Sequence, residues 1–156
     1  MLAGQANSPG AYSKRTVNFL SGLDKRDAES FTQLCDFAWL IEETTPVIFD
    51  EKYQIYNEHG VNFETLSHLE AIGLIKYFPQ AEIMREDLPG TFLASYFGTT
   101  VSLTTDGGKL PTGKVFLTQI GQELSPICGS KAVPGFFEYV WERWKEDAST
   151  KIRPLR

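Results

Sequence analysis

Apolar side chains recur at helical spacing over residues 25–43. At about 100° per residue, eight of them fall on one broad side of a helix that Asp24 would cap. These eight are Ala28, Phe31, Leu34, Cys35, Phe37, Ala38, Trp39 and Ile41. A helix this apolar must be packed on most of its sides. The pattern therefore predicts a long central helix that ends before Pro46, because proline disfavours helical geometry in the preceding residue.

A second amphipathic pattern covers residues 63–72. Asn62 precedes it as a helix-capping residue, and Gly73 follows it as a natural stop. The predicted inward face consists of Phe63, Leu66, Leu69 and Ile72. The predicted outward face consists of Glu64, Ser67, His68 and Ala71.

A last helix is predicted to begin at Pro134, since proline favours the first helical position. Its apolar arc consists of Phe136, Phe137, Val140, Trp141 and Trp144. Two interpretations remain open for this arc. It closes the core of its own domain, or it is an exposed patch that pairs with a second copy or with another protein region. The residues from Ala148 have little to bury, and we expect a loose tail over 148–156.

Runs of residues that favour strands fill much of the stretch after residue 73. The first run spans 74–78, and two more span 91–97 and 99–105. The sequence Asp106-Gly107-Gly108 that follows is a hairpin turn signal. We therefore expect the strand over 99–105 to return along 114–117 as a β-hairpin.

Two short segments resemble parts of winged-helix domains. The run LEAIGLI at 69–75 resembles the segment that closes the third helix and enters the first wing strand, and LTQIGQEL at 117–124 resembles the segment that follows the wing. The resemblance covers residues 24–125. It implies an α+β, winged-helix-like fold with the long central helix, the β-hairpin and the aromatic C-terminal helix, which we place in a single domain over 1–147. The connection over 79–89 is long for a plain wing and leaves the hairpin pairing open.

Short motifs near the N-terminus carry a second resemblance. They are Leu2-Ala3-Gly4, Pro9-Gly10, Ser13, Arg15-Thr16 and Asp27-Ala28. In these motifs the chain resembles an uncharacterised bacterial family known as domain of unknown function 2806. The family places this stretch inside a longer chain, so the resemblance implies an N-terminal portion before Met1. It implies no activity, because the family has none assigned.

Composition places the chain among compact proteins of a reducing compartment. Its 156 residues include 15 Lys and Arg against 20 Asp and Glu, and the net charge is −5. Two cysteines without CxxC spacing form neither a disulfide framework nor a zinc pattern. No apolar run reaches the ~18–20 residues of a membrane span, and the N-terminus lacks the pattern of a signal peptide. We expect a cytoplasmic protein without a membrane partner.

The sequence carries no convincing catalytic or cofactor motif. Residues 108–114 match the skeleton GxxxxGK of a phosphate-binding loop, but Val115 replaces the Ser or Thr that would hold magnesium. His59 and His68 are the only histidines, and neither belongs to a metal-ligand motif. Cys128 in a loop is weak support for a nucleophile. We therefore expect no cofactor, no metal and no enzymatic activity.

The outward face of the 63–72 helix separates the two remaining hypotheses about partners. In a winged-helix DNA-binding protein this helix enters the major groove, where Lys and Arg provide most contacts. Residues 62–73 contain neither, and Glu64 would repel phosphate. Nucleic-acid binding is therefore disfavoured. As a DNA-binding transcriptional regulator, the alternative, the chain would use Lys14, Arg15, Lys109 and Lys114 as phosphate contacts.

We favour a non-catalytic regulatory or protein-interaction module of a bacterial protein. The aromatic side chains of the last helix are the expected anchors for a protein partner or for self-association, namely Phe137, Trp141 and Trp144. Glu64 and His68 would define a second, polar contact surface.

Overall fold

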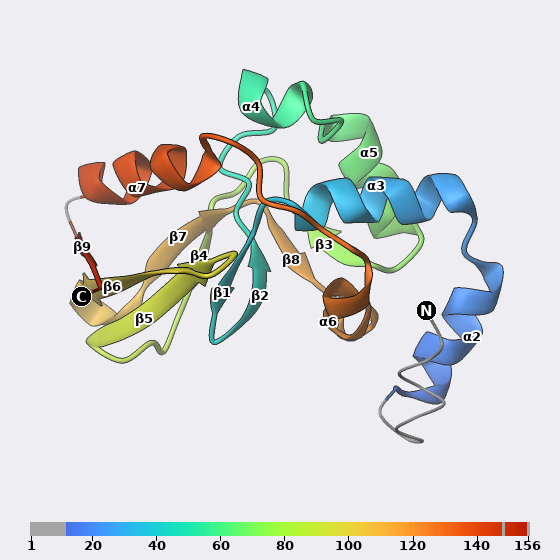
Figure 1. Cartoon of the computed structure of the whole chain (residues 1–156), viewed down its shortest axis with the longest axis horizontal. Coiled ribbons are helices and arrows are strands. Elements are labelled where there is room, and N and C mark those ends of the chain that lie inside the picture. The colour runs from blue at the N-terminus through green and yellow to red at the C-terminus, as the bar shows by residue number, and fades with distance from the viewer. Residues whose placement is uncertain (1–11, 148, 156) are drawn as a thin grey trace.

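The structure is a computed structural model that describes residues 12–147 and 149–155 and combines helices and sheets in an α+β arrangement (Figure 1). Its helices are α2 (Lys14–Gly22), α3 (Lys25–Cys35), α4 (Gln54–Asn57), α5 (Phe63–Ala71), α6 (Gln119–Leu124) and α7 (Phe136–Glu146), with 3-10 turns η1 (Asp106–Gly108) and η2 (Ser125–Ile127). The motifs over residues 2–10 and the portion expected before Met1 lie outside the described residues.

The strands form a five-stranded sheet and two separate pairs, all antiparallel. The order in the large sheet is β2 (Glu43–Pro46), β1 (Ala38–Ile41), β5 (Thr91–Tyr96), β6 (Thr99–Thr105) and β9 (Thr150–Pro154). The pairs are β3 (Ile75–Tyr77) with β8 (Val115–Leu117) and β4 (Ile83–Arg85) with β7 (Leu110–Gly113). Figure 1 shows α7 along one side of the large sheet and α2 projecting at the opposite end of the molecule.

Helix α5 begins where the sequence predicts. The Asn62 side chain accepts a hydrogen bond from the Thr65 amide, and the Thr65 hydroxyl accepts one from the Asn62 amide, both over 3.0 Å. This reciprocal capping box satisfies two donors that the first helical turn leaves free. Leu66 and Leu69 are buried as expected, but Phe63 is 59% exposed and does not belong to the inward face.

The prediction of one long central helix over 25–43 is wrong. Helix α3 starts after its predicted cap, Asp24, but ends at Cys35, and β1 follows from Ala38. Along β1 burial alternates, with Trp39 and Ile41 fully buried and Leu40 54% exposed. The same apolar residues satisfy both a helical and a strand period, and pairing with β2 and β5 decides for the strand.

The predicted hairpin between residues 99–105 and 114–117 is not formed. Strand β6 pairs instead with β5, through a tight turn in which both Phe97 and Gly98 have positive φ (44° and 89°). Strand β8 pairs with β3. The physical reason lies in the long connection after Pro79, which provides β4 as a partner for β7. The glycine-rich sequence at 106–108 forms the turn η1 rather than a hairpin tip.

The prediction of a loose tail over 148–156 is also wrong for its described part. Residues 150–154 form β9, which pairs along β6, with Ile152 opposite Leu103. Thr150 is buried, and its hydroxyl donates a 2.6 Å hydrogen bond to Asp147. Strand β6 would otherwise present an open edge, and the backbone hydrogen bonds that β9 supplies outweigh the small apolar area of the segment.

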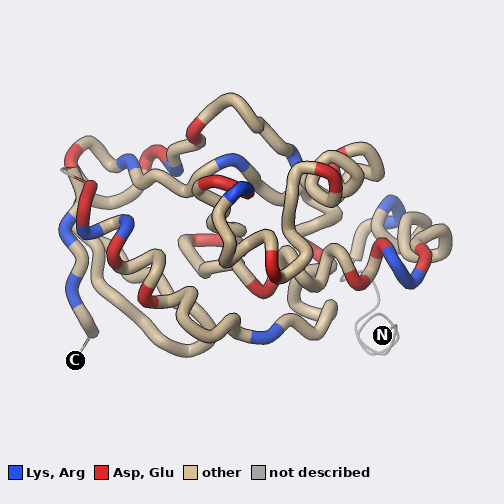
Figure 2. The backbone as a smooth tube through the Cα atoms, turned by 90° about the horizontal axis from the view of Figure 1, so that it is seen from above, with Lys and Arg blue, Asp and Glu red and all other residues tan. Residues whose placement is uncertain are grey.

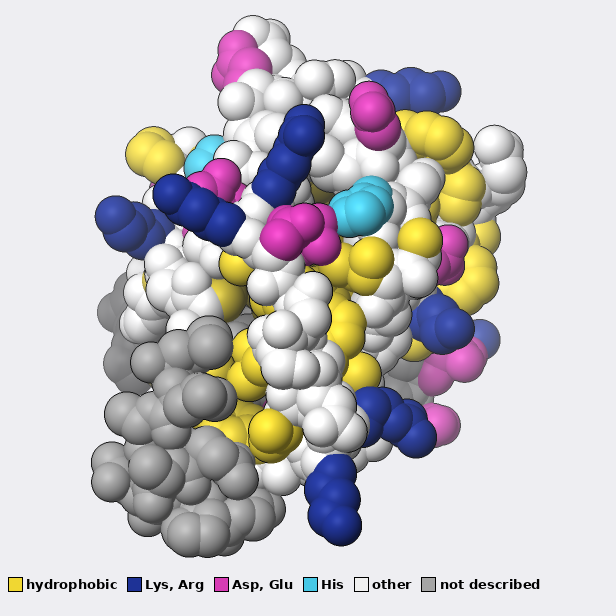
Figure 3. Space-filling view, turned by 90° about the vertical axis from the view of Figure 1, so that its right-hand side faces the viewer, with side chains coloured by type: hydrophobic (Ala, Val, Ile, Leu, Met, Phe, Trp, Pro, Cys, Tyr) yellow, Lys and Arg dark blue, Asp and Glu magenta, His cyan; other side chains and the backbone are white. Residues whose placement is uncertain are grey.

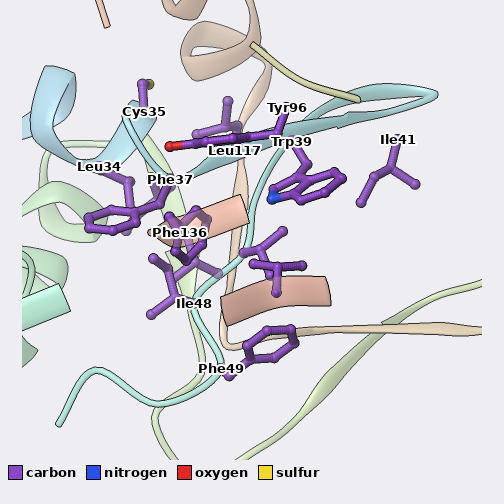
Figure 4. Close-up of a cluster of buried hydrophobic side chains, with 14 of the residues drawn as sticks. Leu34, Cys35, Phe37, Trp39, Ile41, Ile48, Phe49, Tyr96, Leu117 and Phe136 are labelled. Carbon is purple, nitrogen blue, oxygen red and sulfur yellow. The ribbon is translucent and has the colours of Figure 1, made fainter. Parts of the chain in front are cut away.

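The core lies between α7, the large sheet and α3 (Figure 4). Phe37, Trp39, Tyr96 and Phe136 meet there through edge-to-face and stacked contacts with ring centroids 4.8–5.6 Å apart. Helix α7 begins at Phe136, with Gly135 as its N-cap in the left-handed region (φ 83°). Pro134 therefore lies before the helix and not at its first position as predicted.

Candidate interaction groove

Helix α7 directs its aromatic side chains to two different environments. Phe136, Val140 and Trp144 face the core and are buried, whereas Phe137 and Trp141 are half-buried one step around the helix. The apolar arc predicted from the sequence thus exists. Part of it closes the core, and the other part lines a groove at the molecular surface.

The prediction that Trp144 anchors a partner is wrong. Its side chain is 0% exposed, and its indole N–H donates a 2.8 Å hydrogen bond to the carbonyl of Pro111. The indole also meets Trp39 edge-to-face at 4.9 Å. A tryptophan that is enclosed and fully hydrogen-bonded stabilises the fold and has no surface left for a partner.

A groove of about 450 Å³ runs between α7 and the adjoining ends of β6 and β9. Phe137 and Trp141 form its wall on the helix side, with ring centroids 5.9 Å apart. The sheet side and the rims are formed by Thr99, Thr100, Val101, Glu138, Glu142, Pro154 and Leu155. Leu155 is 52% exposed, so the groove presents apolar surface from both sides.

The Phe137 wall of this groove is supported by the core. The ring of Phe137 stacks on the buried indole of Trp39, with centroids 5.5 Å apart and planes inclined by 17°. Trp39 stacks in turn on Tyr96. An aromatic platform held by the core loses little conformational entropy when a ligand covers it, which favours binding.

Two glutamates stand at the helix-side rim of the groove. Glu138 and Glu142 lie one turn apart on α7 and are exposed. Neither takes part in any of the ion pairs formed within residues 12–147 and 149–155. Like charges at this spacing destabilise a helix by about 0.2–0.5 kcal/mol. Repulsion between the two carboxylates therefore remains at the rim, and a cationic ligand would relieve it.

The opposite side of α7 belongs to the core. Tyr139 meets Tyr56 and Phe136, and burial raises the pKa of its phenol to about 12. The Arg143 guanidinium lies 4.7 Å from the centroid of the Phe49 ring, a cation–π contact. These contacts fix the rotation of α7 about its axis, and with it the orientation of Phe137 and Trp141.

Glu64 and His68 are exposed on α5, as predicted. Figure 1 shows α5 apart from α7. His68 Nε2 lies 2.7 Å from a carboxylate oxygen of Asp27 on α3. Around them a polar hollow of about 670 Å³ separates α3 from α5. Figure 3 shows acidic, basic and histidine side chains intermixed on this end of the molecule. The two predicted contact surfaces are therefore separate.

The predicted phosphate contacts do not form one cationic surface. Lys14 and Arg15 lie on α2, whereas Lys109 pairs with Glu86 at 3.5 Å. The Lys114 ammonium donates to the carbonyls of Pro79 and Ala81, at 3.1 and 3.2 Å. Along the described backbone, basic positions are interspersed with acidic ones (Figure 2).

One carboxylate–imidazole pair was missed by sequence reasoning. His59 Nε2 lies 2.6 Å from Asp36, whose other carboxylate oxygen accepts a 2.7 Å hydrogen bond from the Lys131 amide. Phe37 packs edge-to-face against the imidazole at 5.2 Å. Within the described residues, none of the hydrogen bonds joins His59 to a hydroxyl or thiol. The pair ties the α4–α5 connection to the end of α3.

Glu138, Glu142 and the β9 wall were also missed as groove residues. The glutamates carry a sequence signal, since they flank the apolar arc at helical spacing. Pro154 and Leu155 carry none, because their position depends on the pairing of β9 with β6. Within the described residues no helix is both long and apolar enough to cross a bilayer, and no three His, Cys, Asp or Glu side chains converge as a metal site.

Comparison with known proteins identifies a family for this chain. The sequence model of a family described as a protein of unknown function (DUF2806) matches residues 1–141, which include Phe137 and Trp141. No curated protein and no solved structure matches this chain.

Proposed function

The chain belongs to the DUF2806 family of proteins of unknown function, and from its own residues we propose that it is a non-catalytic regulatory or protein-interaction module of a bacterial protein. In this proposal the α7 groove binds a segment of a partner protein that combines Lys or Arg with apolar side chains. The observation that carries the proposal is the apolar groove with Glu138 and Glu142 unpaired, among the described residues, at its rim.

The chemistry of the groove supports a polypeptide occupant. Half-buried aromatic rings such as Phe137 and Trp141 are typical anchors of protein interfaces, because they bury large area at little entropic cost. A Lys or Arg placed near the rim would meet a carboxylate and the face of Trp141 together, which combines ion pairing with a cation–π contact. The net charge of −5 also favours the approach of a basic partner.

The winged-helix likeness stays part of the proposal. It rests on the order of α3, α5, β3 and β8, in which helices precede an antiparallel strand pair. The exposed face of α5 carries Glu64 and His68, which supports a protein partner over a nucleic acid. We therefore do not propose DNA binding.

A cytoplasmic location is likewise proposed. Its support is the small number of cysteines, both of which are free thiols in the structure. Thiols persist in reducing compartments, whereas secreted domains of this size usually use disulfides.

The proposal is tested with a peptide library displayed on phage. Selection on the wild-type protein, after depletion on a Trp141→Ala variant, is expected to enrich peptides that combine Lys or Arg with Leu, Ile, Phe or Trp. Binding of an enriched synthetic peptide is then followed by tryptophan emission. Trp39 and Trp144 are fully buried, so a change in emission reports mainly on Trp141.

Charge-reversal variants locate the site. Glu138→Lys/Glu142→Lys is expected to weaken peptide binding about 10-fold, since each rim charge contributes roughly 0.5–1 kcal/mol. The matched control, Glu29→Lys/Glu82→Lys, reverses two exposed charges outside the groove and is expected to leave affinity unchanged. Enrichment of acidic peptides, or equal weakening by both double variants, would refute the assignment.

A second copy of the chain is the competing occupant. Light scattering coupled to size exclusion distinguishes it, because self-association through the groove would give a concentration-dependent dimer that Trp141→Ala abolishes. We expect a monomer at all concentrations. A dimer of that kind would replace the partner-binding proposal.

A further inference from the structure

The only two cysteines of the chain lie 93 positions apart in sequence, and the fold brings the loop that carries Cys128 against the end of α3 that carries Cys35. Cys35 is the last residue of α3, and Cys128 follows η2 in the loop that leads to α7. Figure 4 shows Cys35 at the margin of the core cluster, with its sulfur directed away from the rings of Phe37 and Trp39. Cys35 is buried, whereas Cys128 is half-buried.

Hydrogen bonds fasten the Cys128 loop to α3 on both sides of Cys35. One helical turn before it, the Thr32 hydroxyl donates to the Cys128 carbonyl over 3.0 Å. Immediately after it, Asp36 accepts the Lys131 amide over 2.7 Å. These two hydrogen bonds place the Cys128 loop beside the helical turn that ends in Cys35.

The two thiols differ in character. The neighbouring Cys128 sulfur and burial raise the pKa of Cys35 well above its usual value. The neighbouring Cys35 thiol is the main cause that lowers the pKa of Cys128 to about 6. The two shifts favour ionisation of the half-buried Cys128 over the buried Cys35, and the un-ionised Cys128 thiol donates a 3.2 Å hydrogen bond to the Ser125 carbonyl. This asymmetry suits an attacking and a resolving cysteine.

A separate hollow adjoins the loop that carries Cys128. A pocket of about 320 Å³ is lined by Cys35 and by Ser125, Pro126 and Ser130, which flank Cys128. Its remaining wall comes from β1, β5 and the turn at Phe97 and Gly98. It lies apart from the α7 groove, since the two share no lining residue.

We propose that Cys35 and Cys128 form a thiol-oxidation site that reacts with low-molecular-weight disulfides. The Cys128 thiolate attacks one sulfur of the small disulfide, a new S–S bond forms, and one small thiolate leaves. Cys35 then gives up its proton and attacks the Cys128 sulfur of the mixed disulfide, and the second small thiolate leaves. The chain loses two hydrogens and two electrons, and the small disulfide gains both as two thiols.

The product would link the end of α3 to the loop before α7. That loop also donates the Val133 amide to Tyr96, over 2.8 Å. The new covalent bond would therefore reinforce the connection that Thr32 and Asp36 already make between α3 and this loop.

The test uses glutathione disulfide on the folded full chain at neutral pH, followed by intact-mass and peptide analysis. The wild type is expected to lose two hydrogen atoms and to yield one Cys35–Cys128 cross-linked peptide. Cys35→Ser retains a hydrogen-bond donor but cannot resolve, so one glutathione adduct is expected to accumulate on Cys128. Cys128→Ser is expected to stay unmodified, because Cys35 is only 2% exposed.

Wild-type reactivity keeps the proposal falsifiable even if a variant fails to fold. The proposal is overturned if the native wild type stays reduced, or if the cross-link forms only after denaturation in urea. It is also overturned if glutathione remains on Cys128 of the wild type without displacement by Cys35. Circular dichroism of the variants confirms that their reactivity is that of the folded state.

Discussion

The buried indole of Trp39 on β1 and the half-exposed ring of Phe137 on α7 are stacked, with centroids 5.5 Å apart. The stack joins the interior of the large sheet to the wall of the surface groove. Because Trp39 is fully enclosed, it supports the Phe137 ring in a fixed position when a ligand contacts that ring. The groove is consequently a direct extension of the core.

Replacement of Trp39 should therefore damage both stability and binding. Trp39→Ala is expected to lower the free energy of unfolding by about 3–5 kcal/mol, the range for large buried aromatic side chains. Leu40→Ala on the same strand, where the side chain is 54% exposed, should cost less than about 1 kcal/mol. Urea denaturation followed by circular dichroism measures both. Equal losses would show that β1 is not oriented as described.

Because β7 passes close to Ile48, we expect alanine substitutions at two glycines, Gly113 and Gly98, to differ in their cost to stability. Gly113 has a φ of 102°, and a Cβ there would overlap the carbonyl of Ile48. Gly98 also has a positive φ, 89°, but open space around it. Gly113→Ala is expected to cost more than about 3 kcal/mol, and Gly98→Ala about 1 kcal/mol from backbone strain alone. Thermal unfolding of both variants decides the comparison, and similar midpoints would contradict it.

Tyr96 is a buried hydrogen-bonding node. Its hydroxyl donates to the Asp36 carbonyl and accepts from the Val133 amide, and burial raises its pKa to about 12. Tyr96→Phe leaves both partners without the hydroxyl, and we expect a loss of about 1–3 kcal/mol. Amide hydrogen exchange should also show faster exchange at Val133. A fully stable variant with unchanged exchange would argue against the node.

Removal of β9 should disable the groove. A chain that stops after Ser149 lacks the strand that covers β6 and the wall formed by Pro154 and Leu155. We expect at least about 2 kcal/mol lower stability, given the burial lost at Thr150 and Ile152, and no binding of the selected peptide. Arg153→Ala, which removes only an exposed side chain, is the control. Retention of peptide affinity by the truncated chain would exclude the β9 wall from the site.

The Cys128 thiolate predicts a distinct pH dependence of alkylation. The rate with iodoacetamide should rise as pH passes about 6 and then level off, because only the thiolate reacts. An ordinary thiol, with a pKa near ~8.5, would still be accelerating above neutrality. Cys35→Ala removes the neighbouring thiol and is expected to move the profile to higher pH. Coincident profiles for wild type and variant would rule out Cys35 as the cause.

Features governed by neighbouring residues were predictable from the sequence. Asp24 and Asn62 start α3 and α5 because their side chains reach amides only three positions away. The turn after the 63–72 pattern and the short strand at Ile75–Tyr77 follow the same logic.

Features that depend on distant partners were not predictable. Trp39 and Ile41 fit a helix and a strand equally well, and pairing of β1 with β2 and with β5, the latter more than 50 residues later, selects the strand. Sequence reasoning placed Phe137, Trp141 and Trp144 on one arc. Which of them lie in the core and which at the surface depends on distant contacts, such as the stacking of Phe137 on Trp39 and the hydrogen bond from Trp144 to Pro111. The thiol pair could not be found from spacing, because it arises from the fold.

The late position of β9 in the chain affects when the groove can exist. While the protein is being synthesised, α7 and β6 emerge from the ribosome before the residues that complete their binding surface. Until residues 150–155 have left the exit tunnel, one side of the groove is missing and the β6 edge is bare. The proposed engagement of a partner therefore requires residues 150–155 to have emerged, and shorter nascent chains need protection from edge-to-edge association.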